Sequence, residues 1–342
     1  GVQLAVRGNS SGFNWSTGVP ARRPAPNTWT VDVWYSAADV GSVFAFKFLV
    51  ADNLWQVGAN EMVTLPAANG STYAVFPWFA STTGTYAVIP NIVSQRLGNS
   101  RNVVVYTPPS YHENTLKSFK RVLFMLDGQN LFNASTSAFG VAWNVQDTVN
   151  QMVVEGLMEE VLIVGIDNAG AARTDEYTYS YDDSVQAGGK ADTYLDFQWD
   201  VVRPLIMAKY RIDAGVTRFG LLGSSLGGLL SCYAAWTRAN NYDIAGCMSS
   251  SFWWNNEDFN TTILAKPRPA QDVTFYLDSG DSGPDNDDET QTLTVRGHLE
   301  SLGYDPFYFL DHGGVHNEAS WGARFHVPMG DLYPPTPGTA TL

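Results

Sequence analysis

The pentapeptide Gly223–Gly227, which reads G-S-S-L-G, has the residue types and the spacing of a serine nucleophile. In a G-x-S-x-G segment the serine lies on a strained strand-to-helix turn, where side chains at the glycine positions would clash with neighbouring backbone. The turn places the hydroxyl above a helix N-terminus, which favours developing negative charge. Only Ser225 fits, because centring the pattern on Ser224 would require glycine at Leu222 and Leu226.

A Gly/Ser-rich loop or a phosphate-binding turn is the alternative interpretation of this segment. The segment has neither the lysine of a P-loop nor the glycine spacing of a dinucleotide-binding loop. It lies between a predicted strand, Arg218–Leu222, and a predicted helix, Gly227–Trp236, as a nucleophile turn requires. We therefore interpret Ser225 as the nucleophile of a hydrolase.

The serine needs a general base, and the sequence offers His112, His298, His312, His316 and His326. In a hydrolase of this kind the base follows the last strand, which we predict at Phe307–Leu310. We favour His316, which follows a glycine pair and precedes a predicted helix start. His312 and His316 could instead form a metal pair, but the intervening glycines argue against a helical spacing. We predict no metal and no cofactor.

The third member of a triad should be an acid after the predicted strand Val273–Leu277. Asp278 is too early, still at the strand end, and several later acids could serve as charges at a helix N-terminus. A calcium loop matches no regular spacing here. We choose Asp287, with Asp285 as its closest rival. The candidates considered are Asp278, Asp281, Asp285, Asp287, Asp288 and Glu289.

Two backbone N–H groups should stabilise the oxyanion. One belongs to Leu226, directly after the nucleophile, and the other to Gly128 or Gln129, which follow a predicted strand ending at Leu126. Trp253 and Trp254 could line an acyl pocket.

From about Ser100 apolar strand-like runs alternate with helix-like segments, which predicts an α/β fold with a doubly wound, mostly parallel sheet. Besides those already named, the predicted strands are Val103–Tyr106, Arg121–Leu126, Glu160–Ile166 and Ile244–Met248, and the predicted helices are Asn144–Met158, Thr193–Lys209 and Asp288–Leu302.

The first part of the chain instead shows short alternating segments typical of a small antiparallel β-sandwich. They are Thr28–Tyr35, Val43–Val50 and Thr72–Phe76. We predict an accessory domain over residues 1–95, a catalytic domain over 96–333 and a Pro-rich tail over 334–342. The accessory tryptophans could offer platforms to sugar rings or could be core residues: Trp15, Trp29, Trp34, Trp55 and Trp78.

The overall composition points away from nucleic acid and membranes. The 342 residues carry a formal net charge of −14 and a pI near 4.6, so the surface should repel phosphate backbones. No apolar run is long enough to span a bilayer. Low pI, five N-x-S/T sequons and a start without Met or leader favour a trimmed, secreted glycoprotein. For Cys232 and Cys247 we favour buried thiols over a disulfide, and the oligomeric state stays open.

Several segments together resemble the putative-esterase family of α/β-hydrolases. This family includes esterase D, the enterochelin esterases, and the feruloyl and acetylxylan esterases of carbohydrate esterase family one. The matching pieces, in family order, are Leu126–Phe132, Val164–Asn168 with Arg173 and Glu176-Tyr177, Gly223–Gly228, Ser251–Trp254, and His316–Glu318 with Trp321 and Arg324.

The resemblance implies Ser225 as nucleophile and His316 as base, and it leaves the acid open. It also implies that Arg173 and Glu176 form a buried pair shaping the floor of the site; the alternative is an exposed loop contact of little energetic value. The first part of the chain resembles the immunoglobulin-like or starch-binding-like β-domains that precede some of these esterases.

These observations predict a serine carboxylic-ester hydrolase whose substrate is an ester-decorated polysaccharide carrying feruloyl or acetyl groups. Alternatives are a siderophore-lactone or polyester hydrolase, because a fold does not select an acyl group. A non-catalytic carbohydrate-binding protein with a dead hydrolase domain is the alternative from another class.

Overall fold

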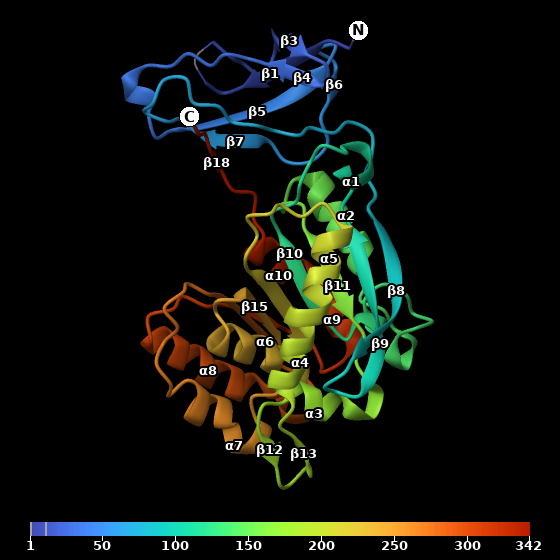
Figure 1. Ribbon diagram of the computed structural model, residues 1–342. Coiled ribbons are helices and arrows are strands. Elements are labelled where there is room, and N and C mark those ends of the chain that lie inside the picture. Colours follow the sequence, from blue (N-terminus) through green and yellow to red (C-terminus); the bar gives the residue numbers. More distant parts are fainter. Residues whose placement is uncertain (1, 11) are drawn as a thin grey trace.

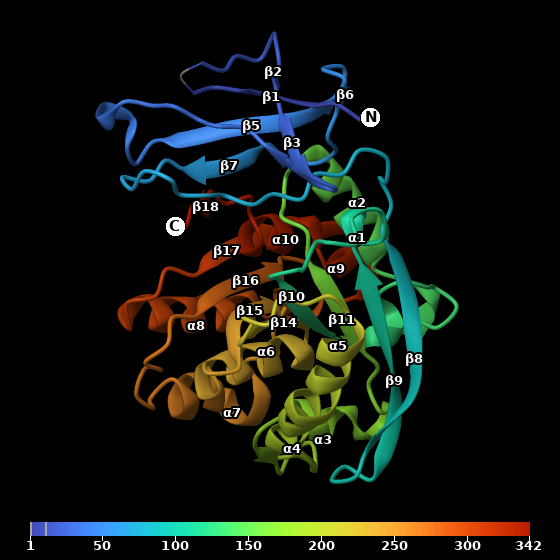
Figure 2. The ribbon, with the colours of Figure 1, turned by 45° about the horizontal axis from the view of Figure 1, so that its top comes forward.

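The computed structural model describes residues 2–10 and 12–342 (Figure 1). A large α/β unit carries an antiparallel β region at one end, and Figure 2 shows both chain termini in or beside that region. The centre of the α/β unit is an eight-stranded sheet of order β17-β16-β15-β14-β10-β11-β9-β8.

Six neighbouring strands of this sheet are parallel, and the two at one edge are antiparallel. The sheet and its order agree with the predicted α/β-hydrolase fold. The parallel strands are β10 (Val122–Leu126), β11 (Leu162–Ile166), β14 (Phe219–Ser224), β15 (Tyr242–Met248), β16 (Thr274–Gly280) and β17 (Phe307–Asp311). The antiparallel strands are β8 (Thr85–Ser94) and β9 (Asn99–Thr107).

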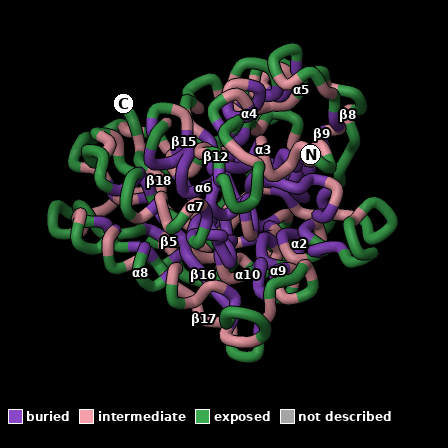
Figure 3. The backbone as a smooth tube through the Cα atoms, turned by 90° about the horizontal axis from the view of Figure 1, so that it is seen from below, coloured by how far each residue is buried: buried purple, intermediate pink, exposed green. Residues whose placement is uncertain are grey.

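Helices cover both faces of the sheet, which explains why strands such as β10 and β11 read as unbroken apolar runs. One core cluster lies under α4 (Ala191–Phe197), α5 (Arg203–Lys209), α6 (Leu226–Thr237) and α8 (Glu289–Ser301). The other lies under α2 (Val145–Glu155), α9 (Glu318–Arg324) and α10 (His326–Leu332). Figure 3 shows this buried interior surrounded by exposed loops. Short helices are α1 (Ser110–Glu113), α3 (Arg173–Tyr177) and α7 (Trp254–Asp258).

Most predicted helices and strands coincide with observed ones to within a few residues. The predicted helix Thr193–Lys209 is the main exception, because a π-helical turn at Gln198–Val202 separates α4 from α5. Pro204 lies just after this turn, at the start of α5, where its missing N–H costs little.

The N-terminal region forms one six-stranded sheet and a separate hairpin. The sheet has the order β18-β7-β5-β1-β2, with β6 paired to β5, and the hairpin joins β3 to β4. The strands are β1 (Leu4–Gly8), β2 (Val19–Pro20), β3 (Arg22–Ala25), β4 (Thr28–Thr30), β5 (Val43–Val50), β6 (Leu54–Trp55), β7 (Glu61–Thr64) and β18 (Gly338–Thr339).

The antiparallel character of this region is confirmed, but its second layer is less regular than a sandwich. The segment Val43–Val50 forms β5 as predicted, whereas Thr28–Tyr35 is a strand only at Thr28–Thr30. The predicted strand Thr72–Phe76 is wrong, because this segment makes only one bridge, between Thr72 and Thr341. The apolar side chains of these segments still cover the small core around Phe44 and Phe46.

The predicted boundary at residue 95 falls inside the large sheet, since β8 pairs with β9 along its length. Pro90 suggested a break, but it lies at an irregularity between Ile89 and Ile92 on an edge strand, where proline is tolerated. The predicted tail also belongs elsewhere: β18 pairs in parallel with β7 of the N-terminal sheet.

The N-terminal region packs against the large sheet at the end where the parallel strands begin. The Lys117 ammonium, just before β10, lies 5.3 Å from the Trp78 ring centroid and 2.5 Å from the Glu160 carboxylate, just before β11. The Glu113 carboxylate accepts hydrogen bonds from the backbone N–H groups of residues 79–81. The nucleophile turn follows the carboxyl end of β14, so it lies at the opposite end of the strands. We call this end of the sheet the catalytic edge.

Cys232 of α6 and Cys247 of β15 are joined by a disulfide, with a Cα–Cα distance of 6.0 Å. The preference for free thiols is therefore wrong. Both side chains are buried, as that preference assumed, but α6 packs so closely on its neighbouring strand that the sulfurs meet. Among residues 2–10 and 12–342 no helix has the length and apolarity to cross a membrane.

Candidate active site

Ser225 lies on the turn between β14 and α6 with φ 60° and ψ −126°. A non-glycine residue in this region is strained, and such strain persists only where the surrounding structure enforces it. A Cβ on Gly223 would lie 2.8 Å from the Gly227 carbonyl carbon, and one on Gly228 would lie 2.8 Å from the Met248 oxygen. The tightest approaches are thus at Gly223 and Gly228, while a Cβ on Gly227 would meet nothing closer than 3.3 Å.

His316 and Asp287 are directly hydrogen-bonded, with 2.6 Å between Nδ1 of the histidine and Oδ1 of the aspartate. The Asp287 side chain is fully buried, and that of His316 is 33% exposed. Asp285, the rival acid, is exposed and makes no hydrogen bond to His316 in the described part of the chain. The structure therefore brings Asp287, and not Asp285, to the imidazole.

The second oxygen of Asp287 is held by donors from three different elements. It accepts hydrogen bonds from the Ser249 hydroxyl and the Gly280 N–H, both at 2.5 Å, and the Arg324 guanidinium lies 3.4 Å away. Burial acts to raise the pKa of Asp287, but hydrogen bonds from His316, Ser249 and Gly280 outweigh burial and hold this pKa below its usual value. The carboxylate is therefore ionised at neutral pH.

Arg324 lies among three carboxylates, those of Asp287, Asp278 and Asp311. Its buried guanidinium lies 2.9 Å from Asp278 Oδ1 and 3.2 Å from Asp311 Oδ2. Burial raises the pKa of Asp278 despite this cation. Asp278 therefore faces Arg324 rather than the imidazole. This position agrees with the expectation that Asp278 comes too early in the chain to serve as the acid.

The region beside Asp287 is acidic. Burial raises the pKa of Asp288 to about 6, although the nearby His316 acts in the opposite direction. Burial also raises the pKa of Glu318, which lies in the first turn of α9. His312 is separate from this group: its Nδ1 contacts Asp281 at 2.8 Å, and its side chain is largely exposed.

The turn after β10 lies beside the start of α6. A Cβ on Gly227 would be 3.7 Å from the Asp127 carboxylate, so the two segments are neighbours. A Cβ on Gly128 would lie 2.7 Å from the backbone of Gly165 and Ile166, which leaves room only for glycine. The Gln129 side chain accepts a hydrogen bond from the Asn168 N–H at 3.1 Å, which anchors the turn to the loop after β11.

The predicted pair of Arg173 and Glu176 is not formed. Arg173 instead binds both oxygens of Asp127, at 2.7 and 2.8 Å. Glu176 is buried and binds Arg101 at 2.7 and 3.0 Å. The two side chains leave the short helix α3 in different directions, Arg173 towards the turn after β10 and Glu176 towards β9. Glu176 is therefore a core residue without access to substrate, and Arg173 remains partly exposed at the site.

The two tryptophans differ sharply. Trp253 is 41% exposed, whereas Trp254 is 1% exposed and donates its indole N–H to the Ser180 carbonyl at 3.2 Å. The prediction that Trp254 lines an acyl pocket is therefore wrong, because its ring fills the core beneath α7.

Sequence reasoning missed two serines that contact these groups. The Ser251 hydroxyl lies 3.2 Å from the Ser225 hydroxyl, and the Ser249 hydroxyl contacts Asp287. Trp321 also contributes, because its ring meets His316 edge-on at a centroid distance of 4.9 Å. The run of three serines directly after a predicted strand was the available signal.

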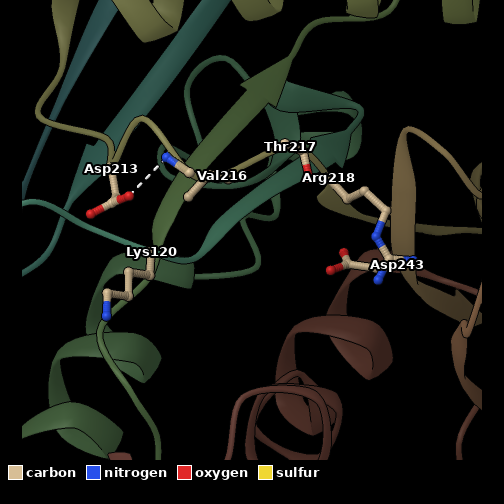
Figure 4. Close-up of a pocket in the computed structure, with 7 residues that line it drawn as sticks. Lys120, Asp213, Val216, Thr217, Arg218 and Asp243 are labelled. Carbon is tan, nitrogen blue, oxygen red and sulfur yellow. Dashed lines mark hydrogen bonds between the residues drawn. The ribbon is translucent and has the colours of Figure 1, made fainter. Parts of the chain in front are cut away.

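A polar hollow of about 300 Å³ lies away from this site, where β10, β14 and β15 begin (Figure 4). Its wall includes Lys120, Asp213, Arg218 and Asp243. Because catalytic groups of parallel sheets gather where strands end, this hollow is not part of the candidate active site. Among the described residues, no group of three or more potential ligands is arranged to hold a metal ion.

Comparison with known proteins supports the same interpretation. The family model described as "Putative esterase" matches residues 94–332. A siderophore enterobactin esterase of Emericella nidulans is 36% identical over 22% of this chain, and the match spans only 25% of that protein. A siderophore triacetylfusarinine C esterase of Aspergillus fumigatus is 40% identical over 20% of this chain and 23% of its own length.

Solved structures share the fold at low identity. The enterobactin esterase of Shigella flexneri aligns over 96% of this chain and 87% of its own, with a TM-score of 0.57 and 16% identity. A ferulic acid esterase aligns over 73% of this chain and 98% of its own, with a TM-score of 0.58 and 16% identity. The family-model match, which spans more than half of the chain, shows that this protein belongs to the putative esterase family.

Proposed function

We propose that Ser225, His316 and Asp287 form the catalytic triad. The observation that carries this proposal is the 2.6 Å contact between His316 and the buried, multiply bonded Asp287, at the sheet edge where Ser225 occupies its strained turn. Asp287 fixes the orientation of the imidazole and stabilises its protonated form. Oriented in this way, His316 takes the proton of Ser225 as its oxygen attacks the ester carbonyl.

The tetrahedral intermediate needs two N–H donors for its oxyanion. We assign one to Leu226, the first residue of α6, and the other to Gly128 or Gln129 on the adjacent turn. The protonated His316 then gives its proton to the leaving alcohol. Water, activated by the same histidine, releases the acyl group.

We propose neutral, ester-decorated polysaccharide as the substrate class, with feruloyl or acetyl groups. Asp285, Asp288 and Glu318 make the surroundings of His316 acidic, which disfavours a polyanionic substrate. Trp253, exposed two residues after Ser251, offers an aromatic surface to an acyl group. The fold likeness to a ferulic acid esterase is compatible with this choice.

A siderophore lactone is the second candidate, favoured by the two fungal relatives whose names are siderophore esterases. The partly exposed Arg173 is a cation that could meet a negatively charged ligand of this kind.

Export would bring the enzyme to polysaccharide. The disulfide supports export, since disulfides persist in oxidising compartments, and so do four exposed sequon asparagines, Asn9, Asn14, Asn69 and Asn133. A drop in intact mass after peptide N-glycosidase treatment of protein from its natural source would be the expected sign.

We also propose that the N-terminal region holds glycan through Trp15 and Trp55. Their rings lie 6.3 Å apart, and both are exposed, whereas Trp78 is buried against the α/β unit. Arg7 stacks over Trp55 and binds Asp52, so polar groups flank the indoles as sugar hydroxyls require.

Replacement of Ser225 by alanine should abolish turnover of p-nitrophenyl acetate, by at least about a thousandfold, because no other group can form the acyl-enzyme. A fluorophosphonate probe followed by peptide mass mapping should label Ser225 in the unchanged protein. Substantial turnover by the alanine variant, or a label on another serine, would refute the mechanism.

Replacement of Asp287 and of Asp285 should have clearly different effects on kcat. Asp287→Asn should lower kcat by about a hundredfold or more, because the imidazole loses the carboxylate that orients it and stabilises its protonated form. Asp285→Asn makes the same chemical change at an exposed position and should alter kcat less than about twofold. Equal small losses would show that neither residue is the acid.

A panel of methyl ferulate, acetylated xylan, short-chain aryl esters and a catecholate trilactone should rank the substrates. We expect higher kcat/KM for the neutral esters, with a loss of roughly fivefold on methyl ferulate for Trp253→Ala, since an aromatic contact contributes about 1 kcal/mol. A trilactone that is hydrolysed best would establish the siderophore alternative instead.

The double variant Trp15→Ala/Trp55→Ala should lose retention on insoluble xylan or cellulose while keeping aryl-ester turnover, because the indoles lie far from the catalytic edge. Trp34→Ala removes another indole, 80% exposed, and serves as the matched control. Equal retention of all three proteins would argue against glycan binding by this pair.

A further inference from the structure

Three consecutive serines, Ser249-Ser250-Ser251, follow β15 directly and are buried. Because β15 lies between β14 and β16, the chain leaving it passes between the nucleophile turn and the acid loop. Ser251 contacts the nucleophile turn and Ser249 contacts the acid loop. The serine segment, as we call residues 249–251, therefore bridges two ends of the proposed triad.

Ser251 faces the nucleophile. Its hydroxyl oxygen lies 3.2 Å from the Ser225 hydroxyl oxygen, and its backbone N–H donates to the Ser225 carbonyl at 3.1 Å. When the Ser225 proton points towards His316, the remaining hydrogen-bonding capacity of its oxygen is as an acceptor. The Ser251 hydroxyl can then donate to that oxygen and continue to do so as negative charge develops on it.

Ser249 faces the acid. Its hydroxyl donates to Asp287 Oδ2 at 2.5 Å and accepts from the Trp321 indole at 2.9 Å and from Arg324. Trp321 is also the ring that meets His316 edge-on. One hydroxyl is thus in contact with the carboxylate and with the side chain that packs against the base.

The backbone of the serine segment is fixed independently of these hydroxyls. The Ser249 N–H lies 3.0 Å from the Asp278 carbonyl and 2.9 Å from its carboxylate. Ser249 has φ 39°, a conformation that persists only under external restraint. Removal of a hydroxyl should therefore leave the path of the chain unchanged.

We propose that Ser249 and Ser251 are positioning residues of the esterase, the first for Asp287 and the second for Ser225. This inference rests on the proposed triad. Ser249 holds Oδ2 so that Oδ1 faces the imidazole, and Ser251 holds the nucleophilic oxygen in its reactive orientation and donates to it as it gains charge.

Ser250 provides the matched control. It is buried like its neighbours, but its hydroxyl has no hydrogen-bond partner within the described residues and faces Gly228. Ser250→Ala removes the same atom from the same segment without touching the triad.

For Ser251→Ala we expect kcat/KM for p-nitrophenyl acetate to fall about tenfold to a hundredfold, the effect of one hydrogen bond to a group that gains charge. The rate constant for inactivation by diethyl p-nitrophenyl phosphate should fall by a similar factor, because it reports nucleophile reactivity without the substrate's binding site. Ser250→Ala should change both quantities less than about twofold. Active-site titration expresses each rate per folded molecule, so partial unfolding cannot mimic the result.

Ser249→Ala should act through Asp287. The charged groups facing this carboxylate are His316 and Arg324, with Asp278 behind Arg324 and Asp285 and Asp288 beside it on the loop. Without the Ser249 donor, less of the negative charge of Asp287 is neutralised by hydrogen bonding, and the carboxylate stabilises the protonated imidazole more strongly. The acidic limb of the kcat/KM profile should therefore move to higher pH. In an Asp287→Asn background the Ser249 replacement should cost little further activity.

The outcomes separate the two proposals. If Ser225→Ala remains active, the triad itself is refuted. If Ser225→Ala is inactive but the Ser249 and Ser251 variants behave as Ser250→Ala does, in rate and in pH profile, only the positioning role is overturned. An unshifted acidic limb for Ser249→Ala, or additive losses with Asp287→Asn, overturns the part that concerns the acid.

Discussion

A carboxylate with no solvent exposure is the constraint on which the catalytic edge depends. Burying such a group unpaired costs several kcal/mol, so the fold must supply its partners. Asp287 receives them from the loop after β17, from the end of β15, from the end of β16 and from α9. Each of these segments must dock correctly before the charge is satisfied, so assembly of the site and assembly of this end of the sheet are one process.

The strained nucleophile turn imposes a second demand on the same segments. The positive φ of Ser225 costs about 1–3 kcal/mol, which the surroundings must offset. Helix α6 is buried along almost its whole length, and its disulfide to Cys247 ties it to β15. The serine segment follows β15 directly and contacts both the nucleophile and the acid. The disulfide therefore joins the helix that follows the nucleophile to the strand that positions the serine segment.

The sequence allowed accurate prediction wherever the physical signal was local. Strand–helix alternation located the parallel sheet, and the glycine pattern located the strained strand-to-helix turn that carries Ser225. The prediction failed where the outcome depends on which neighbour a side chain meets: Arg173 and Glu176 lie three residues apart on one short helix yet point to Asp127 and Arg101. Trp253 and Trp254 differ in burial for the same reason. The disulfide likewise depends on the packing of α6 against β15, which spacing alone does not reveal.

The position of the N-terminal region restricts how specificity can arise. This region packs where the parallel strands begin, with Trp78 and Lys117 at the junction, and therefore leaves the catalytic edge uncovered. Acyl selection must then come from loops of the α/β unit itself. Helix α7 and the hairpin of β12 (Tyr181–Asp182) and β13 (Ala187–Gly188) are joined there through Asp182 and the Asn255 N–H at 3.0 Å. Trp253, just before α7, and Tyr181 of β12 are exposed aromatic residues, so variation in these two loops can change the substrate without disturbing the proposed triad.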